Sequence, residues 1–148
     1  YPSIDDEVIA DISRHDFTPS SLWKLVVSAG RIVAGHPIRS PDDYDPYLQH
    51  PNIESLLPHL FAYFSVLASC ARVSGMTNVA CTVMHGSYIY VVSLIDMANQ
   101  FEWPYVLDYH IGYMNKRLCE MEQGDYTGWG PIDLDLYLSV LTHPRLAR

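Results

Sequence analysis

Apolar residues recur along this chain three and four positions apart, and strict alternation of apolar and polar residues is scarce. The first spacing is typical of amphipathic helices, whereas alternation is typical of strands. A short first helix is predicted near the start, with one apolar face made by Ile4, Val8, Ile9 and Ile12. The chain is therefore expected to be mainly helical from its first residues onward.

A second helix is predicted from about residue 18 to residue 33. Thr18 suits the N-cap position and Pro19 the first helical position, while Gly35 suits the stop. Residues 35–52 then contain four prolines and three aspartates, which predicts a long Pro/Asp-rich loop. Such long loops are uncommon inside compact domains, so this one is expected to be either functional or a junction.

A third helix is expected over residues 58–73, because Asn52 caps only a turn and Pro58 restarts the helix. Gly75 suits its stop. A fourth helix is expected over residues 78–99, with Thr77 or Asn78 as its cap. Its apolar residues fall on several faces, which predicts a central helix: Val79, Val83, Tyr90, Val91, Val92, Leu94, Ile95 and Met97.

Gly86 lies in the middle of this fourth helix, where glycine costs about 1 kcal/mol relative to alanine. The position therefore predicts the close approach of a neighbouring helix.

Trp103-Pro104 opens a fifth helix with proline at the first position, and Gly124 ends it. Its inward positions are predicted as Val106, Leu107, Tyr109 or His110, Ile111, Tyr113, Met114, Leu118 and Met121.

A glycine-rich turn follows at residues 124–130, around Tyr126 and Trp129. A last short helix is predicted over residues 132–141, with three leucines facing inward: Leu134, Leu138 and Leu141. The pattern as a whole predicts an all-α fold, a compact bundle of about six helices that forms a single domain over residues 1–148.

Composition narrows the function classes. The chain has 9 basic and 17 acidic residues and a net charge of −8, which disfavours direct binding of nucleic acid by this segment. Its apolar stretches are interrupted by Ser, Asp, His or Gly, so no membrane span is predicted. Three unevenly spaced cysteines (Cys70, Cys81 and Cys119) and an acidic start favour an intracellular protein, in the cytoplasm or nucleus, over a secreted disulfide scaffold.

Candidate chemistry is sparse. Ser21 and Lys24 match Ser-x-x-Lys, but the companion motifs of that catalytic class are missing. No two of the seven histidines are four residues apart, and the aspartates of residues 42–45 lack the Gly and Glu of a calcium loop. We therefore predict no catalytic residue, cofactor or metal. A small helical enzyme would instead need a buried polar cluster with shifted pKa values, drawn from His85, Asp96, Asp108, His110 and Tyr113.

Eleven tyrosines are the compositional oddity. Three of them recur every four residues in the fifth helix. An aromatic stripe of this kind packs a helix core or lies at a partly hydrated interface. The candidate interaction or scaffold residues are Trp23, Trp103, Tyr105, Tyr109, Tyr113 and Trp129, with Trp129 expected to pin the last turn.

A longer pattern surrounds these aromatic residues. Residues 103–110 read Trp-Pro-Tyr-Val-Leu-Asp-Tyr-His, and residues 117–121 follow as Arg-Leu-Cys-Glu-Met. Further matching positions are Tyr90, Leu94, Ala98, Phe101, Gly124, Tyr126, Trp129, Asp133 and Leu136, with weaker support at residues 12–25. This pattern resembles the helical segment of Gag-like proteins of retrotransposons, in DIRS-like and related fungal elements. It covers mainly residues 88–141.

The resemblance implies a capsid-like or nucleoprotein-like module that associates with itself, as a dimer or larger homo-oligomer. The sequence lacks a zinc knuckle and a basic tail, which fits an assembly domain whose nucleic-acid-binding part lies elsewhere or is absent. The alternative is a helical adaptor or regulator that binds another protein through its aromatic faces. In that case residues 35–52 are the natural docking segment.

Overall fold

The computed structural model describes residues 6–15 and 49–141. Within these ranges the protein is all-α, without a strand, as predicted. The helices are α1 (Asp6–Ser13), α3 (Ile53–Val73), α4 (Thr77–Gln100), α5 (Trp103–Glu122) and α6 (Leu134–Leu136). The last continues directly into a π-helical turn, Tyr137–Leu141.

The described ranges thus hold five helices, where about six were predicted for the whole chain. The helix expected over residues 18–33 and most of the loop expected over residues 35–52 lie outside the described residues. The first predicted helix is confirmed as α1, whose Val8 and Ile12 are buried.

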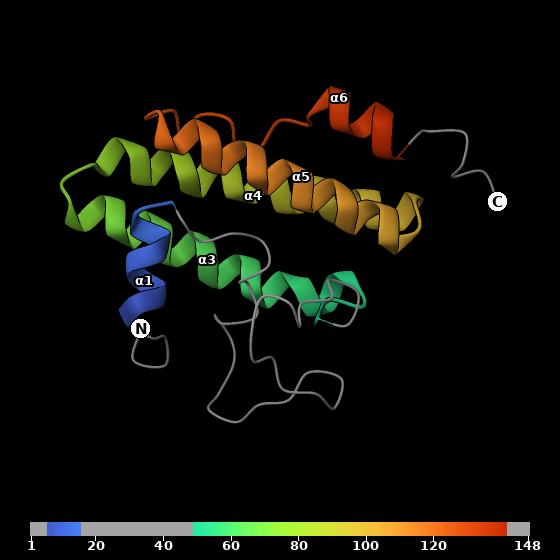
Figure 1. Ribbon diagram of the computed structural model, residues 1–148, viewed down its shortest axis with the longest axis horizontal. Helices are drawn as coiled ribbons and strands as arrows, with labels where there is room; N and C mark the ends of the chain where they lie inside the picture. The colour runs from blue at the N-terminus through green and yellow to red at the C-terminus, as the bar shows by residue number, and fades with distance from the viewer. Residues whose placement is uncertain (1–5, 16–48, 142–148) are drawn as a thin grey trace.

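Three long helices define the architecture. α3, α4 and α5 run beside one another along the long axis, and successive turns lie at opposite ends (Figure 1). α3 and α4 form the most extensive helix pair, α1 packs across α3, and α6 packs on the outer side of α5. One apolar core therefore joins all three long helices.

The start of α3 differs from the prediction. Asn52 is the N-cap: its side chain accepts a hydrogen bond from the Ser55 N–H at 2.9 Å, and the Ser55 hydroxyl oxygen accepts one from the Asn52 N–H at 3.3 Å. This capping box starts the helix at Ile53, so the expected restart at Pro58 is wrong. Pro58 lies in the second turn, where its missing N–H removes one bond of the helix.

Gly75 ends α3, as predicted. Its φ of +81° is in the left-handed region that glycine adopts without strain, and the next N–H, that of Met76, donates to the Ala71 carbonyl at 2.8 Å. α4 begins at Thr77 with Met76 as N-cap and no side-chain cap. The predicted caps, Thr77 and Asn78, are therefore wrong by one or two positions, because both already belong to the helix.

α4 buries only one side. Its inner residues are Ala80, Val83, Gly86, Ser87, Tyr90, Val91, Leu94 and Met97. Val92 and Ile95 are exposed, so the prediction of a helix buried on several faces is wrong. The reason is that the described elements packed on α4, namely α3, α5 and the turn at residues 124–130, all cover its inner side.

By length and composition alone, α3 and α4 are each able to cross a membrane. The core helices of water-soluble proteins pass the same test. Here the two helices bury their inner faces in one shared core.

α5 follows the prediction closely, except that Pro104 is at the second helical position and not the first, because the helix already begins at Trp103. Gly124, at a φ of +87°, lies after its end. α6 does not follow its prediction. Asp133 caps it by accepting a hydrogen bond from the Leu136 N–H at 3.1 Å. Leu136 packs against the core, as do three residues of the widened turn that follows: Tyr137, Val140 and Leu141. Leu141 is buried as expected, but Leu134 and Leu138 are exposed, so their inward prediction is wrong.

Gly86 is explained by a turn and not by a neighbouring helix. A Cβ at this position would lie 2.5 Å from the carbonyl oxygen of Trp129 and 2.9 Å from its Cβ. Real Cβ atoms essentially never approach backbone so closely, so the turn at residues 124–130 rests directly on the α4 backbone. The expectation of a close approach is thus met, but the expected partner is wrong.

Gly86→Ala is expected to destabilise the protein by about 1–3 kcal/mol, since the Trp129 backbone would have to move. This loss outweighs the gain of about 1 kcal/mol that alanine brings to a helix. Gly112→Ala in α5 is the matched control, because its Cβ would meet only the tip of the Leu136 side chain at 3.2 Å. Urea unfolding should find Gly112→Ala as stable as the unmodified chain or more stable. A Gly86→Ala variant as stable as the unmodified chain would contradict the packing of the Trp129 backbone on α4.

Candidate functional site

The buried aromatic cluster is organised around Trp129, which is 3% exposed. Its indole ring is enclosed by four aromatic rings from three helices: Tyr63 and Phe64 of α3, Tyr90 of α4 and Tyr113 of α5. The nearest ring is that of Phe64, edge-on with a centroid distance of 4.7 Å. The indole N–H points at the sulfur of Met121 at 3.5 Å. Trp129 therefore fills the point where the three long helices meet.

The Tyr113 hydroxyl holds the turn that carries Trp129. Its oxygen accepts a hydrogen bond from the Gly130 N–H at 2.9 Å. The same oxygen lies 2.9 Å from each of two carbonyl oxygens, those of Gly128 and Pro131, and donates its one proton toward them. The Arg117 guanidinium lies 4.5 Å from the centroid of the same ring. Tyr113 thus acts as a structural anchor in the core.

Tyr109 anchors the next segment. Its hydroxyl accepts a hydrogen bond from the Asp133 N–H at 2.9 Å, and burial raises the pKa of the phenol to about 12. The Asp133 carboxylate in turn pairs with Lys116 at 2.9 Å, which fixes the start of α6 on α5. Tyr109 and Tyr113 are both fully buried, so they support the scaffold and do not present an exposed face.

The other candidate aromatic residues lie nearer the surface. Trp103 is half-buried and donates its indole N–H to the His50 carbonyl at 2.6 Å, which ties the start of α5 to the segment before α3. Tyr105 is also half-buried. Trp23 lies outside the described residues.

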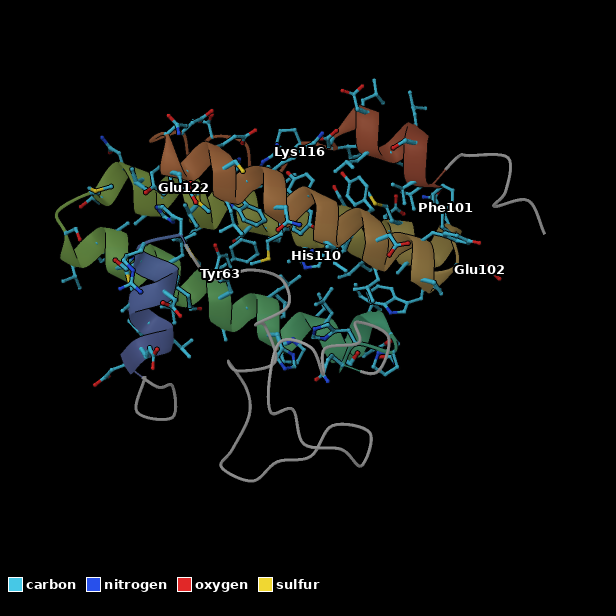
Figure 2. The ribbon with its side chains drawn as sticks, in the orientation of Figure 1. Tyr63, Phe101, Glu102, His110, Lys116 and Glu122 are labelled. Carbon is cyan, nitrogen blue, oxygen red and sulfur yellow. The ribbon has the colours of Figure 1, made fainter. Side chains whose placement is uncertain are left out.

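One buried polar pair crosses between α4 and α5. The Tyr90 hydroxyl lies 2.7 Å from Nδ1 of His110, and both side chains are at most 2% exposed. The pKa of His110 is lowered to about 3, mainly by burial and to a smaller extent by His50. His50 has its pKa lowered to about 4, mainly by burial. Both imidazoles are therefore neutral at pH 7, and Figure 2 shows His110 in the space between α3 and α5.

A neutral His110 defines the direction of this hydrogen bond. Burial raises the pKa of Tyr90 well above its ordinary value, so the phenol keeps its proton and donates to Nδ1. The ring proton of His110 is then on Nε2, which has no hydrogen-bond partner among the described residues. The pair is an uncharged structural contact and not a general base poised near neutral pH.

The residues of the enzyme hypothesis are not brought together. His110 and Tyr113 are buried, whereas His85, Asp96 and Asp108 are exposed. In the described part of the chain, no three His, Cys, Asp or Glu side chains are placed to hold a metal ion. Ser21, Lys24 and the acidic residues 42–45 lie outside the described residues.

The outer side of α4 carries the feature that sequence reasoning missed. A row of seven uncharged residues follows this side, and all seven are exposed: Thr77, Cys81, Met84, Tyr88, Val92, Ile95 and Asn99. We call this row the α4 seam. Its apolar centre is dominated by Tyr88, which is 71% exposed. Of these seven residues, only Val92 and Ile95 were predicted from the sequence to lie on a buried face, and the row was not identified as a surface.

A second surface feature is a groove of about 630 Å³ between α1 and α3. Its walls are mostly small and apolar: Asp6, Ile9, Ala10, Ser13, Val66, Ser69, Cys70, Val73 and Ser74. Burial raises the pKa of the Cys70 thiol, so this thiol is less nucleophilic than an exposed one. All three cysteines are free, and Cys81 and Cys119 are exposed.

Comparison with known proteins adds no further constraint on the function of this surface. No family model matches the chain, and no curated protein or solved structure is significantly similar to it. The likeness to Gag-like segments therefore stays a prediction from the motif at residues 88–141.

Proposed function

We propose that this chain is a non-enzymatic self-association domain of the Gag-like, capsid-like type. The observation that carries the proposal is the α4 seam, which exposes four large apolar side chains in one row: Met84, Tyr88, Val92 and Ile95. Contiguous exposed apolar surface of this kind is typical of protein interfaces. The helix beneath it has 24 residues, and Asp96 is the one Asp, Glu, Lys or Arg residue among them.

Charge makes this surface distinctive. The chain has a net charge of −8, so two copies repel each other over most approaches. An uncharged helix face is where that repulsion is smallest. The same net charge supports the proposal that this segment does not bind nucleic acid directly. Three free thiols support an intracellular, reducing compartment.

A helical adaptor that binds another protein is the second candidate. The groove of about 630 Å³ between α1 and α3 favours it, because exposed apolar grooves are typical places for a partner to bind. An adaptor of this kind would be a monomer or a simple dimer under all conditions. The two proposals therefore differ in how mass depends on solution conditions.

Salt provides the test. We expect size-exclusion chromatography with light scattering to give a larger mass at high salt than at low salt, because salt shortens the range of repulsion from about 30 Å at 0.01 M to about 3 Å at 1 M. A mass of 16.8 kDa at both salt concentrations would favour the adaptor. A mass that falls with salt would indicate charge-driven association and would contradict the role of the α4 seam.

A further inference from the structure

We propose that the α4 seam is a homotypic interface in which α4 of one copy packs antiparallel on α4 of a second copy, about a two-fold axis at Tyr88. The inference rests on the proposed function and adds the surface and the geometry. A two-fold interface must be complementary to itself, because the same patch is used by both copies. Three features of the α4 seam meet this requirement.

The first feature is its spacing. The steps between successive seam residues are 4, 3, 4, 4, 3 and 4, and they read the same in both directions from Tyr88. In an antiparallel pair centred on Tyr88, each residue therefore faces another seam residue: Tyr88 itself, Met84 with Val92, Cys81 with Ile95, and Thr77 with Asn99. No seam residue is left opposite a gap.

The second feature is the order of polarity. The polar residues Thr77 and Asn99 lie at the two ends, and the larger apolar residues lie between them. An apolar centre with a polar rim is the common anatomy of a protein interface. The repeat of about 3.67 residues is close to the period of a straight helix, so the row stays on one side of α4 along its whole length.

The third feature is the charge, which favours a second copy over a lipid surface. Helices that lie on membranes carry lysine and arginine on their polar side. α4 contains neither, and the net charge of −8 repels anionic lipid headgroups. A second copy requires no positive charge on α4, since the α4 seam is uncharged in both copies.

The size of the seam predicts the strength of association. From Thr77 to Asn99 it is about 33 Å long and about 10–12 Å wide, or roughly 350 Å². Specific interfaces bury about 800 Å² on each partner. The exposed Ile89, the residue after Tyr88 on α4, adds to this apolar surface. We therefore expect weak, reversible dimers.

Tyr88→Glu tests the surface. It places a carboxylate on the two-fold axis, where it faces its own copy, so the variant should stay monomeric at concentrations at which the unmodified chain dimerises. Phe61→Glu is the matched control: Phe61 is 53% exposed on α3, away from α4, and its variant should dimerise normally. Circular dichroism should find both variants folded, since both side chains are exposed.

The outcomes separate the two proposals. If the unmodified chain never associates, the proposed function and the interface both fail. If it associates and Tyr88→Glu associates equally well, only the interface fails, because the contact lies elsewhere. If Phe61→Glu also abolishes association, the effect is one of added charge, and the α4 seam is not the interface.

Disulfide trapping tests the antiparallel register. Ile95→Cys is made in a Cys119→Ser background, so that native Cys81 faces position 95 of the second copy. Within one chain these positions are about 21 Å apart along α4, too far for a disulfide, whose Cα atoms lie within about 7 Å. We expect mild oxidation to give a covalent dimer linked from residue 81 to residue 95, identified by peptide mass spectrometry. Linkage of residue 81 to residue 81, or no linkage, would overturn the register.

Discussion

Trp129→Ala is expected to lower the free energy of unfolding by about 3–5 kcal/mol, the range for removing a large buried aromatic side chain. The indole is the central ring of the aromatic cluster and contacts α3, α4 and α5 at once. Its removal leaves a cavity between three helices that are held at fixed distances by their other contacts, so the surroundings cannot close fully around it. The measurement is equilibrium urea unfolding followed by circular dichroism.

Leu134→Ala is the control for this experiment. Leu134 is 64% exposed on α6, so its truncation should change the stability by less than about 0.5 kcal/mol. Trp129→Phe should fall between the two, because a smaller ring keeps part of the packing. A Trp129→Ala variant that melts like the unmodified chain and has the same oligomer size would contradict the role of Trp129 as the pin of the last turn.

Acidification from pH 7 to pH 5 is expected to cost about 4 kcal/mol of stability. The pKa of an unfolded histidine is about 6.5, whereas burial lowers that of His110 to about 3 and that of His50 to about 4. Between these values the unfolded chain binds more protons than the folded one, so stability falls as the pH falls below 6.5. Each histidine contributes up to about 1.4 kcal/mol per pH unit.

His110→Gln should remove about half of this pH dependence. The glutamine carbonyl still accepts the hydrogen bond from Tyr90, but the side chain does not titrate. His85→Gln, at an exposed position of α4, is the matched control for the substitution itself. Urea unfolding at intervals between pH 7 and pH 5 measures both. Equal slopes for His110→Gln and the unmodified chain would show that His110 is not buried in its neutral form.

Much of the described fold was predictable because helical spacing and glycine stops are local signals. Gly75 and Gly124 end helices through their own backbone conformation, with φ values of +81° and +87°, so the sequence is sufficient to find them. The inner stripe of α5 was predictable for the same reason. Its apolar residues repeat at the helical period and face one core.

The errors came from long-range packing. Gly86 signals a close approach, but only the fold shows that the approaching group is the Trp129 backbone, 43 positions later. Val92 and Ile95 are large apolar residues of the kind that fill a core. Their exposure depends on which elements pack on α4, and the fold decides this. Leu134 and Leu138 are exposed because the π-helical turn at Tyr137–Leu141 changes the helical spacing before the buried Leu141.

The candidate site was hidden for a related reason. An apolar row on a helix has the same pattern whether it faces a core or a partner, since both bury it. For Tyr109 and Tyr113 the row packs the interior, and their hydroxyls hold the segment at residues 128–133. For Tyr88 the row faces outward. Only the fold separates the two cases.

The concentration dependence of the mass of the unmodified chain tests self-association most directly. Sedimentation equilibrium at high salt should give an average mass that rises from 16.8 kDa toward at least twice that value as the concentration increases. Such a rise is the signature of reversible association through a modest interface. A mass that stays at 16.8 kDa over the whole range would contradict a self-association domain and leave the adaptor as the better account.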